Sequence, residues 1–242
     1  MLCQISKLLG KKLFLNNENS ESEFSISDFL FDGTTWNMKY AVIEKKHWFH
    51  HRRHLISPFF LKDFNDLSGD KPIFVDLTRQ EVEKCPPEEN DPPLSMEYKK
   101  MITERNAYYG SWGFSVDVPQ IEPNFNGRLS DILNNNKLRS FIETKKYHLM
   151  AENEKLGHIK DALIDIRRWK INYLVVATWN YFSKRSILFS TKLIENISYF
   201  DRNIQTKIVK NEIKNAPQFI ANHFSDLEEK KLADYYQKLK GA

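Results

Sequence analysis

The sequence has few cysteines and no long apolar run. Cys3 and Cys85 are the two cysteines among 242 residues, and their separation fits neither a CxxC pair nor a metal-ligand spacing. We therefore expect no disulfide framework, and a reducing cytoplasm is the expected location. No stretch of about 18 apolar residues occurs, so the sequence predicts no membrane span. Lysines interrupt the apolar residues near the start, which does not resemble a secretory signal.

Neither a strong charge excess nor an enzyme motif is present. The chain carries 36 Lys and Arg against 32 Asp and Glu, a net charge of +4. This excess is small beside the concentrated basic charge of dedicated nucleic-acid binders. No Gly-x-Ser-x-Gly elbow, phosphate loop, dinucleotide fingerprint or His-Glu-x-x-His pair occurs. We accordingly predict no enzyme, no catalytic residue, no cofactor and no bound metal.

An internal repeat is the strongest feature that the sequence does contain. Residues 26–57 align without a gap with residues 159–190, at a constant offset of 133. Eleven of the 32 aligned positions are identical, whereas roughly two identities are expected by chance. The match extends on both sides, since 77–86 resembles 208–217 and 11–18 resembles 147–154. The chain is therefore two copies of one unit, and two similar domains are the natural prediction.

Both copies are predicted to be mainly β. Apolar and polar residues alternate from Trp36 to Val42, which is the period of a half-buried strand, and a matching segment runs from Trp169 to Val175. An apolar run before each segment ends at Asp32 or Asp165, where we predict a hairpin with a type I turn. Further strands are expected at 54–57, 73–77 and 187–190.

Short helices are predicted to follow the strands. Thr78, with Glu81 three residues later, forms a capping-box pattern before a helix that ends at Pro86. Helices are also predicted at 95–110 and 225–241. Residues 111–136 are rich in Gly, Pro and Asn and are predicted to be a linker. The expected domains are residues 1–110 and 137–242, each a β unit with a C-terminal helical extension.

Two segments carry a family resemblance. "FLFDGTTWNMKYAV" and "ALIDIRRWKINYLV" share the pattern Asp-x-x-x-Trp-x-φ-x-Tyr-x-Val, where φ is apolar. With their flanking segments they resemble the tandem PRC-barrel proteins. The resemblance implies a mainly β fold of two small antiparallel β-barrels in tandem. The same module is found in the cytoplasmic part of the photosynthetic reaction-centre H subunit and in a ribosome maturation factor, where it resembles a docking module rather than a catalyst.

The functional-looking residues that recur in both copies are interpreted as scaffold. They are Asp28, Asp32, Trp36 and Tyr40 with their counterparts Asp161, Asp165, Trp169 and Tyr173. The aspartates could instead bind a cation or act as an acid–base pair, and the aromatics could stack on a ligand. Turn capping and core packing are the simpler interpretations, because no calcium-loop spacing and no partner ligands accompany the aspartates.

One basic segment occurs in the first copy but not in the second. It contains His47, His50, His51, Arg52, Arg53 and His54. The second copy has Asn180, Ser183, Lys184 and Ile187 where the first has histidine, so no shared structural role demands histidine. The segment could bind a metal through imidazole nitrogens, form a basic contact surface, or be a solvated hairpin. A solvated hairpin is preferred, and a contact surface is the leading functional alternative.

These features predict a non-catalytic interaction module in the cytoplasm. It would dock on a protein partner of unknown identity or on a second copy of itself, since edge strands of small open barrels can pair across a dimer axis. An RNA- or ribosome-associated factor is the alternative, based on the mild basic charge and the basic segment; nucleic acid is not the preferred partner. A metal-binding protein or an unrecognised enzyme is the third possibility.

Overall fold

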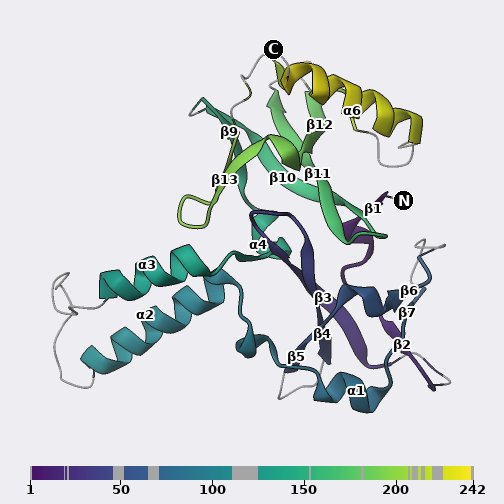
Figure 1. Cartoon of the computed structure of the whole chain (residues 1–242), viewed down its shortest axis with the longest axis vertical. Coiled ribbons are helices and arrows are strands. Elements are labelled where there is room, and N and C mark those ends of the chain that lie inside the picture. Colours follow the sequence, from purple (N-terminus) through teal and green to yellow (C-terminus); the bar gives the residue numbers. More distant parts are fainter. Residues whose placement is uncertain are drawn as a thin grey trace.

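The computed structural model describes most of the chain. The described residues are 2–18, 20, 22–45, 52–64, 71–110, 125–152, 154–180, 183–206, 208, 212–213, 216–219 and 226–240. Within them the protein is mainly β with short helices, as the sequence predicts. Figure 1 shows two β regions stacked along the long axis, a helical hairpin that projects from one side, and the C-terminal helix over the upper end.

The first repeat is built on two open sheets. One has the order β5-β4-β3-β8, which comprises β5 Arg52–Ile56, β4 Met38–Lys45, β3 Phe24–Asp32 and β8 Leu138–Ser140. The other has the order β2-β7-β6, which comprises β2 Leu13–Leu15, β7 Ile73–Val75 and β6 Leu61–Lys62. β2 and β7 run parallel. The strands predicted near 54–57 and 73–77 are therefore present as β5 and β7.

The second repeat arranges equivalent strands in one sheet. Its order is β12-β11-β10-β9-β14-β13, which comprises β9 His148–Ala151, β10 Glu154–Asp165, β11 Lys170–Asn180, β12 Ser183–Ser190, β13 Ile194–Ser198 and β14 Asn203–Thr206. β9 and β14 are parallel, as are β2 and β7. Across the described strands these sheets are open, so the closed form of the predicted barrels is not observed. Part of one edge of β3 and of β10 is instead occupied by a strand from the other repeat.

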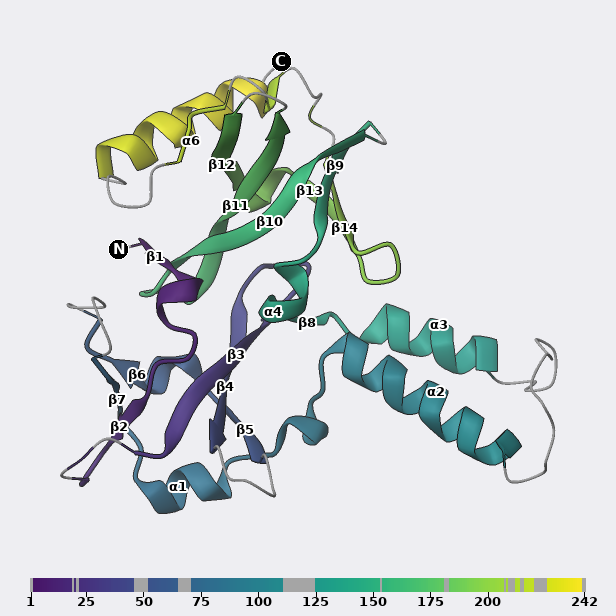
Figure 2. The same ribbon diagram turned by 180° about the vertical axis from the view of Figure 1, so that it is seen from behind.

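The two repeats exchange their first strands. β1 (Leu2–Gln4) pairs with β10 of the second repeat, whereas β8, which begins the second repeat, pairs with β3 of the first. Each exchanged strand leads into a short helix, η1 (Ile5–Lys7) or α4 (Phe141–Thr144). Figure 2 shows β1 beside the upper sheet and β8 beside β3. Both repeats also contribute to one large hydrophobic cluster. Each of the predicted units, 1–110 and 137–242, therefore has a sheet that a strand of the other unit completes.

The helices follow the sequence signals except in the predicted linker. α1 (Arg79–Lys84) begins with the expected capping box between Thr78 and Glu81. α2 (Leu94–Gly110) and α6 (Asp226–Lys240) match the two longer predicted helices, and η2 (Pro58–Phe60), η3 (Glu88–Asn90) and η4 (Thr191–Leu193) are single 3₁₀ turns. No described helix is both long and apolar enough to cross a membrane.

The linker prediction for residues 111–136 is wrong over its second half. α3 (Phe125–Asn135) lies there and packs beside α2 to form the projecting hairpin in Figure 1. Leu129, Ile132 and Leu133 recur at helical spacing and are partly buried, but neighbouring Gly and Asn residues obscure this period. Residues 111–124 lie outside the described residues.

Candidate functional site

Asp28 is a buried junction between the two repeats. Its carboxylate accepts a hydrogen bond from the Ser140 hydroxyl at 2.5 Å and from the backbone N–H of Ile142 at 3.1 Å. Both donors belong to the exchanged segment that begins the second repeat. The backbone N–H of Phe29 donates to the same carboxylate at 2.7 Å. Asp28 therefore holds β8, a strand of the second repeat, against β3 of the first repeat.

Asp161 does the same for the other exchanged strand. Its carboxylate accepts from the side-chain amide of Gln4 at 3.0 Å and from the backbone N–H of Ser6 at 3.1 Å, and the Ser6 hydroxyl also donates to it. Gln4 and Ser6 belong to the N-terminal segment that crosses from the first repeat. No cluster of three His, Cys, Asp or Glu side chains suited to a metal occurs in the part of the chain that the structure describes. The hydrogen bonds of both aspartates to exchanged segments are those of the scaffold interpretation.

Asp32 and Asp165 cap the predicted turns. Asp32 accepts from the backbone N–H groups of Thr34 at 2.9 Å and Thr35 at 2.7 Å. Asp165 accepts from the backbone N–H of Arg167 at 3.1 Å. Such side-chain bonds to the backbone two or three residues later are typical of aspartate in turns. They also lower the pKa of Asp32, since these donors favour its charged form.

Trp36 and Trp169 lie in the turns and not, as predicted, in the strands. Their backbones take φ values of 63° and 49°, a region that bulky side chains rarely adopt. The turns meet across the repeats: Met38 donates its N–H to the Trp169 carbonyl at 2.7 Å, and Ile171 donates to the Trp36 carbonyl at 2.9 Å. Both indoles are buried, as the core interpretation requires. The reciprocal bonds compensate for the strained backbone.

The two recurring tyrosines differ. Tyr173 is buried in the main hydrophobic cluster, as predicted. Tyr40 packs against the smaller cluster of the first repeat but stays half-buried, and its hydroxyl donates to Asp91 at 2.8 Å. Lys39 forms an ion pair with the same carboxylate at 2.7 Å. The core prediction is therefore confirmed for Tyr173 and only partly met by Tyr40.

Two residues of the predicted contact surface at 47–54, Arg53 and His54, make contacts within the protein. His54 is only 8% exposed, and its Nδ1 lies 3.1 Å from the Cys85 carbonyl oxygen. Arg53 forms a 2.6 Å ion pair with Glu88, which is 3% exposed. Both side chains thus hold internal contacts, and within β5 Arg52 alone is exposed. His47, His50 and His51 lie outside the described residues.

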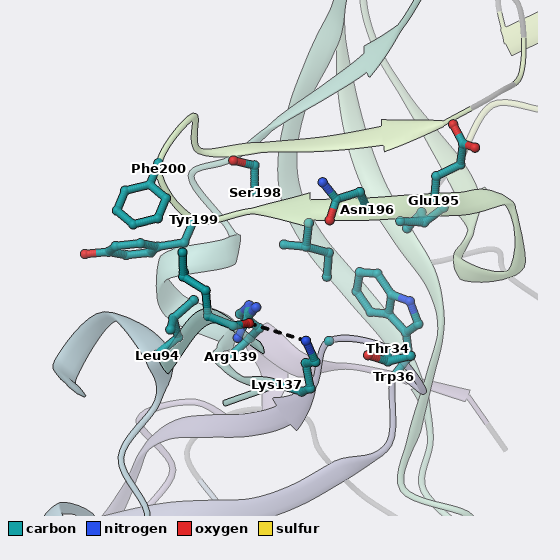
Figure 3. A pocket seen from close by; sticks show the side chains of 14 residues that line it. Thr34, Trp36, Leu94, Lys137, Arg139, Glu195, Asn196, Ser198, Tyr199 and Phe200 are labelled. Atoms are coloured by element: carbon teal, nitrogen blue, oxygen red, sulfur yellow. Dashed lines mark hydrogen bonds between the residues drawn. The ribbon is translucent and has the colours of Figure 1, made fainter. Parts of the chain in front are cut away.

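A cavity of about 460 Å³ lies where the two repeats meet. The turn at Gly33–Trp36, the start of α2, the end of α3, residues 137–139 and the β13–β14 hairpin all contribute to its wall. Figure 3 shows Trp36 and Glu195 toward one end, Tyr199 and Phe200 toward the other, and Arg139 between them. Its volume is in the range of ordinary ligand sites.

Arg139 is the unusual charged group of this cavity. It is partly buried, and desolvation lowers the pKa of its guanidinium. Nη1 donates at 3.0 Å to the carbonyls of Asn136 and Leu138, but buried Nε has no hydrogen-bond partner. Among the described residues, no carboxylate lies within ion-pairing distance of it. Asp32 is the nearby acid, and its carboxylate already accepts from the turn.

The equivalent place in the other repeat is apolar. Strand register pairs Arg139 with Phe31 and Cys3 with Ile164, so Cys3 is the counterpart of Arg139. By the offset of 133, Ile166 corresponds to Gly33 and Phe64 to Ile197. Cys3, Ile166 and Phe64 pack into or against the main cluster, and Phe64 contacts the Trp169 ring edge-on at 5.5 Å. The two repeats therefore differ at three equivalent positions, which are apolar in one repeat and a glycine, an arginine and a smaller aliphatic residue in the other.

An aromatic group borders the cavity. Tyr98 of α2 contacts Tyr199 and Phe200, which follow β13, with ring centroids 5.8 and 5.1 Å apart. Phe200 is 50% exposed. A large apolar side chain that remains exposed beside a cavity is a feature of interaction sites. We call Tyr98, Tyr199 and Phe200 the aromatic rim.

The cavity combines positive charge with apolar surface. Lys137 and Arg139 supply positive charge, and the rim supplies apolar surface. Against this geometry, comparisons with known proteins add no assignment: no protein-family model matches the chain, and no curated protein matches it.

Sequence reasoning did not find this site. The residues that distinguish it from the other repeat are Gly33, Arg139 and Ile197. They are far apart in the sequence, and none belongs to a motif. Comparison of the two copies at these positions could have flagged Arg139, because it stands opposite a buried cysteine. To align Cys3 with Arg139, the offset of 133 has to change for the N-terminal segments of the two copies. Only the pairing of β1 and β8 in the structure shows that change.

Proposed function

We propose that this protein is a non-catalytic docking module that holds a partner protein at the cleft between its two repeats. The observation that carries the proposal is the aromatic rim beside Arg139. Tyrosine, phenylalanine and arginine are enriched in protein interfaces, and tyrosine and arginine often dominate binding energy. The projecting α2–α3 hairpin extends this face away from the body (Figure 1).

We further propose that each repeat is an opened relative of the PRC-type barrel. The equal strand order in both repeats and the parallel pairs β2–β7 and β9–β14 support this. In this view each unit stays open because it receives its neighbour's first strand. We also place the protein in the cytoplasm, in keeping with its two free cysteines.

RNA binding through residues 47–54 has less support, because Arg53 and His54 are engaged inside the protein. The partner proposed here is a different protein. A second copy of the chain is one of the outcomes that the experiment below separates.

Cross-linking mass spectrometry in cells tests the docking function. Lys99 and Lys137 are exposed beside the cleft and suit amine-reactive reagents. We expect cross-links from these lysines to one other protein. They should be lost in Phe200→Ser, because the substitution removes half-exposed apolar surface from the rim.

Phe59→Ser is the matched control. Phe59 is 56% exposed in η2 of the first repeat, outside the cavity wall, so its variant should keep the cross-links. Equal loss in both variants, or a protein that stays monomeric and without cross-links, would contradict the proposal. Cross-links between two copies of this chain would favour a homodimer instead.

A further inference from the structure

Arg139 forms no ion pair with any described carboxylate of the cavity wall, and Asp32, the nearby acid, is already held by hydrogen bonds of its turn. Buried arginines are usually paired with a carboxylate or phosphate, because desolvation of an isolated charge is costly. Here the backbone carbonyls of Asn136 and Leu138 accept from Nη1, while Nε is left without a partner. Tyr147 cannot supply the counter-charge, since burial raises its pKa to about 12 and keeps it neutral.

The space around Arg139 depends on residues that the other repeat does not share. A Cβ added at Gly33 would lie 3.1 Å from Cγ of Arg139 and 3.3 Å from the Lys137 carbonyl oxygen. A side chain there would require the Arg139 stem to shift by a few tenths of an ångström. Ile197, where the other repeat has Phe64, also leaves more room. An unpaired cation and the room to reach it therefore occur together in one repeat, while the other repeat has apolar residues.

We propose that this cavity receives an acidic side chain from a peptide segment of the partner protein, with Arg139 as its receptor and the aromatic rim holding a neighbouring apolar residue. The inference rests on the docking function proposed above and specifies what the partner presents.

The chemistry of the wall favours this ligand. The guanidinium offers a planar fork of donors that suits a carboxylate, and among the described residues no group accepts a hydrogen bond from its Nη2. Lys137 adds a second positive charge. An extended nucleic-acid backbone fits less well, because Glu195 lies in the same wall and the cavity has few cations. One acidic side chain and one apolar neighbour fill a space of about 460 Å³ reasonably.

Selection from a displayed library of random 12-residue peptides tests the proposal without knowledge of the partner. The full chain is the bait, and Arg139→Met, in which length and volume are nearly kept, is the counter-selection bait. We expect peptides enriched on the wild type to contain Asp or Glu next to an aromatic or aliphatic residue. Synthesised peptides should bind at least tenfold more weakly to Arg139→Met, and equally weakly when the acid is changed to its amide.

Two further variants separate a direct contact from a folding defect. Ile197→Phe keeps the arginine but fills the cavity with the counterpart's side chain, and it should also weaken binding at least tenfold. Arg52→Met removes an exposed cation of β5 and should leave binding unchanged. Arg139→Met should melt close to the wild-type temperature, since relief of a partly buried charge offsets the loss of the two hydrogen bonds from Nη1. A lower melting temperature would mark Arg139 as structural and overturn the proposal.

The outcomes also separate this inference from the docking function. Enriched peptides without an acid, peptides that bind Arg139→Met equally well, or no enrichment at all would overturn the carboxylate site. Rim-dependent cross-links in cells could still be found in that case, and docking would stand. If the wild-type protein gives no cross-links in cells but binds peptides through Arg139, the cellular docking proposal is rejected and the carboxylate site stands.

Discussion

The Ser140 hydroxyl donates to the carboxylate of Asp28 at 2.5 Å across 112 residues of sequence. Ser6 makes the equivalent contact with Asp161 across 155 residues. These contacts join each repeat to the first strand of the other, so the exchange of strands links the stability of the two repeats. Loss of one contact should therefore affect both repeats.

Asp28→Ala should destabilise the protein by about 3 kcal/mol, because buried N–H and O–H donors lose their acceptor and Arg53 loses a nearby acid. Ser140→Ala should cost about 2 kcal/mol, because its hydroxyl donates to Asp28 and also accepts from the backbone N–H of Glu143 at the start of α4. Urea unfolding of both variants and of the double variant gives the coupling between them. Strictly additive effects would show that the two side chains act independently, contrary to this prediction.

The stability should depend on pH through Asp28 and Glu88. Burial raises the pKa of both carboxyls in the folded protein, more than Arg53 and the other donors lower it. The folded state then binds protons more tightly than the unfolded chain, whose carboxyl pKa values are about 4. Their stabilising contribution is complete below that pH and is lost as the pH rises through the raised values. Urea unfolding between acidic and neutral pH measures it.

The control for this pH effect is the double variant Asp28→Asn with Glu88→Gln. Its free energy of unfolding should fall less than that of the wild type as the pH rises. Parallel curves for the two proteins would mean that other carboxyls control the pH dependence.

Cys3 should be almost unreactive in the folded protein. Burial raises the pKa of its thiol to about 12, so its thiolate fraction at pH 8 should be roughly a thousandfold below that of a free cysteine. Cys85 is half-buried, with a pKa that burial raises by less. Labelling with iodoacetamide, followed by peptide mass spectrometry, should modify Cys85 first. Equal rates in the native protein, with both cysteines labelled after denaturation, would contradict the burial of β1.

Gly157→Ala should destabilise the second sheet by more than about 2 kcal/mol, since clashes with backbone leave no easy relaxation. A Cβ at Gly157 would lie 2.2 Å from the carbonyl oxygen of Ala177 on β11. Gly10→Ala is the comparison. A Cβ at Gly10 would have no atom within 4 Å, but φ is 79°, so the substitution is unfavourable only because of the left-handed backbone. That penalty is about 1 kcal/mol. Thermal unfolding of both variants checks the order, and a larger loss for Gly10→Ala would refute it.

Local signals predicted much of the fold. Thr78 and Glu81 form the capping box that their spacing predicts, and Asp32 and Asp165 cap the predicted turns. The alternation around Val42 and Val175 correctly placed two long strands. These features depend on neighbours in the sequence, where the hydrogen bonds are short-range. The left-handed backbone of Trp36 and Trp169 could not be predicted, because bonds from the opposite repeat sustain it.

The sequence by itself determined that this protein is a duplicated β unit, because a repeat of buried positions is visible without coordinates. Only the tertiary structure decided which repeat β1 and β8 complete, since a three-residue strand has too few side chains to specify its partner. The tertiary structure also decided which residues form the candidate site. Gly33, Arg139 and Ile197 acquire a shared role only when two turns and an exchanged strand meet, and that meeting depends on packing between distant segments.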